Sequence, residues 1–266
     1  MAELVFLKLG GSLITDKTVP YTPRTGKMAE IASEIAEARL THPNMTLVLG
    51  HGSGSFGHTP AKKYATRQGV KTSEEWAGFA EVWLQASTLN RTMMEALHSA
   101  GIPAVALAPV ASVFARHGKV ARWDLNPLRR CLNAKILPVI YGDVVFDEIR
   151  GGTILSTEDL FSHLAYELKP QRILLAGLEE GVWADFPERK DKVGRITPES
   201  YAAIKQRVGA GRGADVTGGM ESKVEQMLGL VQSVPGLAVQ IFSAEKPGNL
   251  SKVMGGETLG TVISTT

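Results

Sequence analysis

A glycine-rich segment, Gly50 to His58, carries the clearest chemical signal in the sequence. Four of its nine residues are glycine, and it follows the apolar run Met45 to Leu49. Glycines let a backbone turn several N–H groups toward one point and approach a ligand closely. Where such a loop opens onto a helix N-terminus, it suits an anion and above all a phosphate. His58 adds a donor that can carry charge near neutral pH.

Lysines stand beside three glycine turns of the sequence. Lys8 interrupts the apolar run Leu4 to Leu9, Lys17 lies in the loop that follows, and Lys223 comes just after Gly218-Gly219. Most lysines are solvated surface residues, and each of these could be one. Lys8 is the exception, because a lysine inside an apolar strand needs an anionic partner or a route to water.

Other phosphate-binding classes fit the sequence less well. Gly52-x-Gly54-x-x-Gly57 matches the dinucleotide fingerprint, but it follows the second expected strand and no acidic residue ends a strand about twenty residues later. A Rossmann oxidoreductase is therefore disfavoured. P-loop and protein-kinase signatures are absent. A purely structural glycine loop stays open as an alternative, although glycine turns at five apparent strand ends argue against it.

Composition excludes several classes of protein. The 266 residues are 44% hydrophobic and 21% charged with a net charge of +2, which gives no sign of nucleic-acid or membrane-surface binding. Cys131 is the single cysteine, and no His/Cys cluster has zinc spacing, so we expect no disulfide framework and no protein metal ligands. No signal peptide or membrane span is visible, and we expect a cytoplasmic protein.

Strands and helices are expected to alternate along the chain. The expected strands are 4–9, 45–49, 103–107, 136–141, 172–176, 239–243 and 261–263, with a hairpin arm at 118–123 and paired short strands at 144–146 and 153–155. The expected helices are 28–40, 74–100, 126–133, 157–168, 198–208 and 217–233. This alternation predicts an α/β fold, with an open, mostly parallel central sheet between two helical layers.

The motifs together resemble the amino acid kinase superfamily. They are Lys8-Leu-Gly-Gly-Ser12 with Lys17, Gly52 to His58, Tyr141-Gly-Asp143 and Asp215-Val-Thr-Gly-Gly-Met-x-x-Lys223. Within the superfamily they are most similar to the isopentenyl phosphate kinase branch. The resemblance implies a three-layer αβα sandwich, ATP and Mg²⁺ as cofactors, isopentenyl phosphate as the small-molecule substrate, and a homodimer. It also implies an acceptor half, residues 1–170, and an ATP half, residues 171–266, that share one sheet.

The resemblance assigns roles to individual residues. The residues implied to act in catalysis are Lys8, Lys17 and His58. The residues implied to bind ATP are Lys8, Gly10, Gly11, Ser12, Gly54, Asp185, Gly218, Gly219 and Lys223. The acceptor phosphate would contact His58, Thr157 and the backbone amides of Gly52, Ser53, Gly54 and Gly57. Asp143 and Asp159 would orient lysines or a water-bound Mg²⁺, or else be a turn residue and a helix-start acid.

Two departures and several alternatives remain at this point. Ser53 replaces a glycine that the family often has, and Gly177-Leu-Glu-Glu-Gly-Val182 differs from the usual nucleotide-side segment. The acceptor tail could lie against a group of apolar residues that an ordinary core would also explain: Phe79, Val82, Trp83, Ile140 and Phe146. The chain could also phosphorylate another small phosphate or a phosphonate such as fosfomycin, or bind an anion or nucleotide without catalysis.

Overall fold

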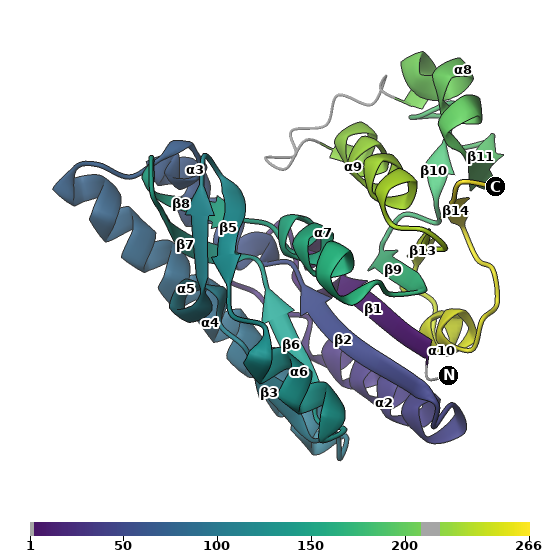
Figure 1. Cartoon of the computed structure of the whole chain (residues 1–266), viewed down its shortest axis with the longest axis horizontal. Coiled ribbons are helices and arrows are strands. Elements are labelled where there is room, and N and C mark those ends of the chain that lie inside the picture. The colour runs from purple at the N-terminus through teal and green to yellow at the C-terminus, as the bar shows by residue number, and fades with distance from the viewer. Residues whose placement is uncertain (1–2, 209–218) are drawn as a thin grey trace.

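A central sheet runs through the computed structural model, which describes residues 3–208 and 219–266, the side chains of 206–208 excepted (Figure 1). Within these residues the sheet has eight strands in the order β12-β14-β13-β9-β1-β2-β6-β3. Neighbouring strands are parallel except β13 and β14. The strands are β1 (Glu3–Leu9), β2 (Met45–His51), β3 (Ala104–Ala106), β6 (Leu137–Tyr141), β9 (Arg172–Gly177), β12 (Arg195–Ile196), β13 (Ala238–Ser243) and β14 (Thr261–Ile263).

Helices cover both faces of this sheet because its strands are apolar on both sides. Val5 and Leu7 of β1 pack with helices α2 (Thr25–Thr41), α4 (Ser73–Ser99) and α10 (Asn249–Met254). Phe6 of the same strand packs on the other face, with helices α6 (Asn126–Asn133), α7 (Thr157–Leu168) and α9 (Gly219–Ser233). The chain is therefore a three-layer αβα sandwich with a mostly parallel sheet, as the sequence predicts.

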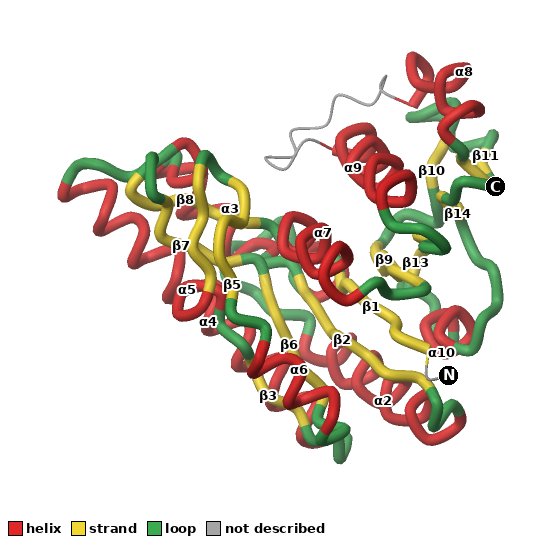
Figure 2. The backbone as a smooth tube through the Cα atoms, viewed as in Figure 1, coloured by secondary structure: helices red, strands yellow, loops and turns green. Residues whose placement is uncertain are grey.

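A second, four-stranded sheet lies beyond the carboxyl ends of the central strands, next to helix α3 (Gly54–Tyr64) (Figure 2). Its order is β5-β4-β7-β8. The strands are β4 (Val113–Arg116), β5 (Lys119–Trp123), β7 (Asp143–Asp147) and β8 (Gly151–Leu155). A small apolar cluster that includes Phe79, Val82 and Val144 joins α4 to this sheet. The hairpin arm and the paired short strands predicted from the sequence are confirmed.

Side-chain caps define the starts of two helices. Thr72 and Glu75 form a capping box at the start of α4, and Ser156 and Asp159 form one at the start of α7. The sequence predicts the start of α7 from the serine and the acids of its first turn, which is confirmed. Among the described residues, no helix has both the length and the apolar character needed to cross a membrane.

The elements that the sequence does not predict are all short. Leu13 and Ile14, expected in a loop, belong to helix α1 (Gly11–Ile14). The other missed elements are α5 (Pro109–Ser112), β4, α10, the 3-10 helix η1 (Thr66–Gln68), the two-stranded sheet of β10 (Val182–Trp183) and β11 (Lys192–Val193), and β12. Elements of two to six residues complete at most about one and a half helical turns or one strand period, so they leave no periodic pattern to detect. The helix α8 (Pro198–Val208) is found where it was expected.

Candidate active site

One cavity of about 380 Å³ lies where the glycine turns after β1, β2 and β6 meet the N-terminus of α7. In open α/β sheets, ligands bind at the carboxyl ends of the strands. This cavity lies at that position. It gathers most of the residues singled out in the sequence, namely Lys8, Gly10, Gly11, Ser12, Lys17, Gly52, Ser53, Gly54, Gly57, His58, Asp143, Thr157 and Lys223. Residues from positions 8 to 223 therefore converge on one space.

Three predicted ATP-binding residues are not among those that line the cavity. Gly218 lies outside the described residues. Gly219 begins α9 with a φ of +69°, a conformation that glycine adopts without strain. The Asp185 carboxylate accepts hydrogen bonds from the backbone N–H groups of Lys190 and Asp191, so it helps to shape the turn between β10 and β11.

The buried lysine of β1 has the anionic partner that its position requires. Lys8 is 8% exposed, and its Nζ donates a hydrogen bond to Glu158 Oε1 in the first turn of α7. Burial alone would raise the pKa of Glu158, but the charges of Lys8 and Lys223 outweigh it and leave that pKa below its ordinary value. Glu158 therefore stays ionised between two lysines. The sequence marks it only as an acid in a helix start.

The backbone amides of the glycine loop are used differently from the prediction. Gly52 N–H donates to Leu9 O over 2.9 Å, and Gly57 N–H donates to Ser53 O over 3.2 Å. The expectation that these two amides bind the acceptor phosphate is therefore wrong, although both residues line the cavity. The Gly52 amide closes the connection between β1 and β2, and the Gly57 amide forms part of the first turn of α3. The N–H groups of Ser53 and Gly54 have no hydrogen-bond partner among the described residues, so they are the donors that the loop still offers.

The two glycine turns touch backbone to backbone. A Cβ placed on Gly11 would lie 2.4 Å from Gly54 N, and Gly54 itself has a φ of +49°. Thr15 joins the same two segments: its Oγ1 donates to Gly11 O over 2.7 Å and accepts from Ser55 N–H over 3.0 Å. The β1 turn and the glycine loop thus form one rigid wall, and side chains larger than hydrogen are excluded at their contact.

The first turn of α7 forms the opposite wall. The capping box uses Asp159 N–H, and the N–H groups of Thr157 and Glu158 are among those that a helix leaves without internal partners. The Thr157 hydroxyl does not face a ligand, since it donates to His51 O over 2.6 Å. Asp159 Oδ2 lies 3.1 Å from the Arg67 guanidinium. This helix end is positive in the sense of the helix dipole and faces the cavity.

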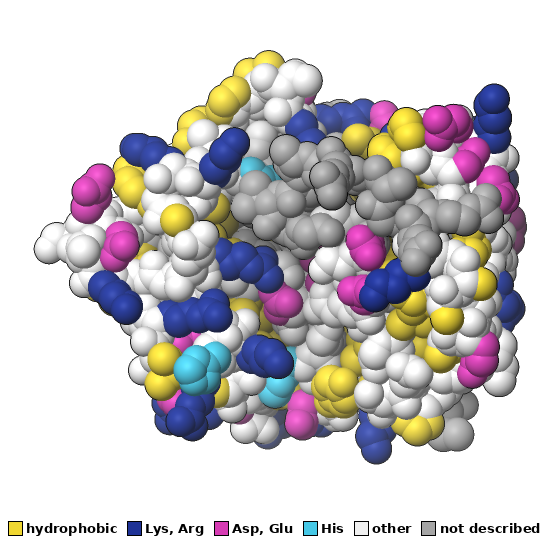
Figure 3. Space-filling view, turned by 90° about the horizontal axis from the view of Figure 1, so that it is seen from above, with side chains coloured by type: hydrophobic (Ala, Val, Ile, Leu, Met, Phe, Trp, Pro, Cys, Tyr) yellow, Lys and Arg dark blue, Asp and Glu magenta, His cyan; other side chains and the backbone are white. Residues whose placement is uncertain are grey.

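Cations dominate the cavity lining. Lys62 of α3 and Arg67 of η1 join Lys8, Lys17 and Lys223, whereas the acids of the lining are Asp143 and Glu158. Lys62 and Arg67 were not predicted, because nothing in their sequence surroundings distinguishes them from surface residues. Seen from above, Lys and Arg side chains gather in the middle of this face beside His, Asp and Glu (Figure 3). Such a lining suits a ligand with several phosphates.

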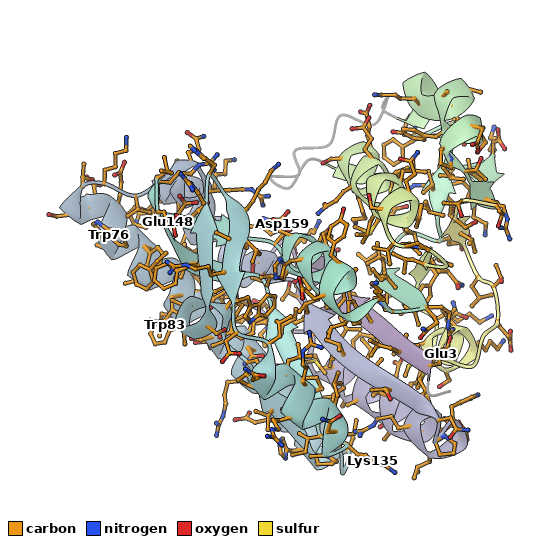
Figure 4. All side chains as sticks on the ribbon, viewed as in Figure 1. Glu3, Trp76, Trp83, Lys135, Glu148 and Asp159 are labelled. Carbon is orange, nitrogen blue, oxygen red and sulfur yellow. The ribbon has the colours of Figure 1, made fainter. Side chains whose placement is uncertain are left out.

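Part of the cavity lining is apolar. Ala61 of α3, Val82 of α4 and Ile154 of β8 line it and belong to one apolar cluster, and Ala65, just after α3, and Leu155 also line the cavity. Val82 is the one residue of the predicted tail pocket that lines it. Phe79 and Ile140 are buried in the core, while Phe146 and Trp83 are exposed on the surface, Trp83 on the outer part of α4 (Figure 4). For the other four residues, the predicted pocket is wrong.

Asp143 is a buried acid in the cavity wall. It is 1% exposed, and its Oδ1 accepts the Val144 N–H over 2.8 Å. Its Oδ2 has no hydrogen-bond partner among the residues described. Burial raises the pKa of Asp143 to about 7. Near neutral pH this carboxyl therefore exchanges a proton while facing the cavity, rather than serving only as a turn residue.

Replacing Asp143 with asparagine is expected to stabilise the protein more at pH 8 than at pH 5. The folded-state pKa lies above the ordinary value of 3.8, so the folded state holds a proton that the unfolded chain loses between about pH 4 and 7. The stability of the unmodified protein falls as the pH rises through that window. At pH 8 the gain of Asp143→Asn should be on the order of a few kcal/mol, measured by urea unfolding.

Asp147 provides a control of opposite sign on the same strand. It is also buried, but the backbone N–H groups of Gly118, Arg150 and Ile149 outweigh burial and lower its pKa. Asp147→Asn should therefore destabilise the protein at neutral pH, and this loss of stability should be smaller in acid. A pH-independent gain for Asp143→Asn would show that folding does not shift the pKa of Asp143.

The chain matches the model of the amino acid kinase family over residues 3–243. It is 34% identical to the isopentenyl phosphate kinase of Methanocaldococcus jannaschii, with 98% of each chain covered. It is 32% identical to the isopentenyl phosphate kinase of Methanothermobacter thermautotrophicus, with 98% of this chain and 99% of that protein covered. An X-ray structure of an isopentenyl phosphate kinase superposes with a TM-score of 0.83 at 30% identity, covering 98% of this chain and all of the other.

Proposed function

The chain belongs to the amino acid kinase family, and from that premise we propose that it transfers the γ-phosphoryl group of ATP to isopentenyl phosphate. The products are isopentenyl diphosphate and ADP. The observation that carries this proposal is that Lys8, Lys17 and Lys223 line one cavity together with the glycine loop, the N-terminus of α7 and several apolar side chains. A phosphate with a short apolar tail matches both parts of that lining.

The chemistry needs charge neutralisation rather than a base. A phosphate monoester is largely dianionic at neutral pH, so its oxygen can attack without first losing a proton. Repulsion between that dianion and the ATP polyphosphate is what opposes the reaction, and phosphoryl transfer is mainly positioning and electrostatic stabilisation. Lys8, held by Glu158, and Lys223 would bind the β- and γ-phosphates. Lys17 would stabilise the transferring group.

The acceptor would lie on the side of the glycine loop. Its phosphate would accept hydrogen bonds from the Ser53 and Gly54 amides and from His58, and its tail would lie along Val82 and Ile154. ATP would enter from the side of β9 and α9. On this proposal residues 1–170 serve mainly the acceptor and residues 171–266 mainly ATP, on either side of β1 in the shared sheet.

Magnesium would be carried by the nucleotide. No group of three or more His, Cys, Asp or Glu residues that could hold a metal ion occurs among the described residues. Mg²⁺ usually keeps several waters and binds one or two carboxylates together with substrate phosphates. The cavity offers Asp143 and Glu158 as its carboxylates, which fits an ion brought in on ATP. When bound, it would neutralise phosphate charge.

An ADP-release assay with a series of acceptors tests the proposed function. Isopentenyl phosphate should give the highest kcat/KM, ahead of dimethylallyl phosphate, geranyl phosphate and fosfomycin. Preference for fosfomycin would make the chain a phosphonate kinase. ATP binding without turnover of any acceptor would make it a nucleotide-binding protein of the same fold.

Replacing His58 with alanine should raise the KM for isopentenyl phosphate by tenfold or more, because a hydrogen bond to a charged group is worth about 1.5–3 kcal/mol. The KM for ATP should change far less, since His58 lies on α3 at the acceptor side of the cavity. Steady-state kinetics with each substrate varied in turn measures both constants. A larger increase in the KM for ATP would move His58 to the nucleotide side.

We also propose a homodimer that pairs the face formed by α4 and β3. This face exposes Trp83, Leu84 and Val105, each between 41% and 52%, and β3 is an edge strand of the central sheet. Large exposed apolar side chains beside an unpaired strand edge are typical of an interface. Light scattering should give the mass of two chains, and Trp83→Glu with Leu84→Glu should halve it. A monomeric unmodified protein would contradict this.

A further inference from the structure

The peptide group between Gly52 and Ser53 has its two polar atoms on opposite sides. The peptide is trans, so the Gly52 carbonyl and the Ser53 N–H point in opposite directions. Ser53 lines the cavity, and its N–H is one of the two loop donors that the fold leaves for a phosphate. Whatever holds the Gly52 carbonyl therefore sets the direction of the Ser53 N–H.

His51 holds that carbonyl from the buried side. Its side chain is fully buried, it is not part of the cavity lining, and its Nδ1 lies 3.1 Å from Gly52 O. The other ring nitrogen, Nε2, lies 3.1 Å from the side-chain amide of Asn90 on α4. Asn90 is itself buried, at 6% exposure. The two side chains form a chain of hydrogen bonds that runs from α4 to the glycine loop.

The proton on the ring can be placed from its partners. Burial lowers the pKa of His51 below its ordinary value, so the ring is neutral at pH 7 and carries one N–H. A carbonyl oxygen can only accept, so Nδ1 donates to Gly52 O and Nε2 accepts. Asn90 must then present its NH₂ group to Nε2, the orientation opposite to the one in which Oδ1 faces that nitrogen.

The ring has little freedom to turn away. It stacks on Tyr141 with the ring centroids 5.5 Å apart and the planes 10° from parallel. Its own backbone carbonyl accepts hydrogen bonds from the Thr157 hydroxyl and from Gly142 N–H, which tie the end of β2 to α7 and to the end of β6. Three neighbouring segments therefore fix the imidazole beneath the glycine loop.

We propose that His51 and Asn90 are positioning residues that aim the Ser53 N–H at the acceptor phosphate. Neither residue touches the ligand. Asn90 orients His51, His51 holds the Gly52 carbonyl away from the cavity, and the Ser53 amide consequently points into it. The inference rests on the proposed function only for the identity of the acceptor, because any phosphate in the loop would use the same amide.

Substitutions can distinguish the effect of losing these hydrogen bonds from the effect of changing side-chain volume. His51→Leu and Asn90→Leu remove the hydrogen bonds and keep apolar bulk. His51→Asn retains a side-chain NH₂ close to the position of Nδ1 and should restore part of the effect. Leu89→Ala is the matched control: Leu89 is adjacent to Asn90 on α4, is fully buried, and packs in the core beneath the sheet rather than under the loop.

The test follows the Ser53 amide resonance in ¹⁵N-labelled protein during titration with inorganic phosphate and, separately, with isopentenyl phosphate. In the unmodified protein and in His51→Asn the resonance should move downfield on titration. In His51→Leu and Asn90→Leu it should not move, and the KM for isopentenyl phosphate should rise by roughly tenfold to a hundredfold, with the KM for ATP unchanged within about threefold. Leu89→Ala should lower the melting temperature. Its Ser53 resonance should still move on titration, and its KM for isopentenyl phosphate should stay normal.

Two results would overturn the inference. The first is a Ser53 amide resonance that still moves on titration, and an acceptor KM that stays normal, in both His51→Leu and Asn90→Leu. The other is the same change of KM in Leu89→Ala, which would make the effect a general loss of stability. If isopentenyl phosphate is not turned over while inorganic phosphate still moves the Ser53 amide only when residue 51 donates a hydrogen bond, the proposed substrate is wrong and the positioning role stands.

Discussion

Replacing Lys17 with alanine is expected to lower kcat by about a hundredfold or more, because a preorganised charge aimed at a transferring group is typically worth that much. Lys17 is exposed in the loop between α1 and α2, yet it lines the cavity together with Lys8 and Lys223. Lys8 is buried against Glu158, whereas the exposed Lys17 can follow the phosphoryl group during transfer. The melting temperature should not change.

Lys63→Ala is the control for this prediction. Lys63 belongs to α3, carries the same charge and lies near the site, but it points to Glu81, 3.7 Å away, and does not line the cavity. Its removal should leave kcat within about twofold, as for most surface substitutions. A Lys17→Ala protein with a normal kcat would contradict the catalytic role of Lys17. A normal kcat with a raised KM for ATP would instead make Lys17 a binding residue.

Replacing Gly11 with alanine should abolish most of the activity and also reduce stability. The added methyl group would lie 2.4 Å from Gly54 N and 2.5 Å from Gly54 Cα, and backbone atoms cannot move aside as a flexible side chain can. One of the two glycine turns must shift. Because a displacement of about 1 Å at a reacting centre can cost a hundredfold, kcat/KM should fall by at least that factor.

Gly26→Ala is the matched control for Gly11→Ala. Gly26 lies in α2, and a Cβ placed there meets no atom within 4 Å. In a helix, alanine is about 1 kcal/mol more favourable than glycine, so this variant should be active and slightly more stable. Thermal unfolding and kcat/KM, measured for Gly11→Ala and Gly26→Ala, test this prediction. Normal activity in Gly11→Ala would mean that the two turns can separate without losing the site.

Much of the fold follows from local patterns in the sequence. Apolar runs such as Leu4 to Leu9 mark strands buried on both faces, and the amphipathic pattern after Gly26 marks a helix on the sheet. The glycine turns and the lysines beside them locate one edge of the sheet as the site, because parallel strands end at a common edge. In the structure these residues line one cavity at that edge.

Local patterns cannot identify contacts between residues that are distant in sequence. Glu158 lies 150 residues from Lys8, and its role is visible only once α7 is placed against β1. The glycine loop predicts that the amides of Gly52 and Gly57 bind a ligand, but these N–H groups donate to Leu9 O and Ser53 O. Phe79 and Ile140 were placed in a ligand pocket because core and pocket residues have the same composition.

The most direct test of the kinase proposal is ³¹P NMR of isopentenyl phosphate incubated with ATP, Mg²⁺ and the protein. The expected result is replacement of the monophosphate signal by the two coupled signals of isopentenyl diphosphate, with ADP formed in equal amount. Lys17→Ala should show almost no conversion in the same time. Formation of ADP and free inorganic phosphate while isopentenyl phosphate stays unchanged would contradict phosphoryl transfer to this acceptor.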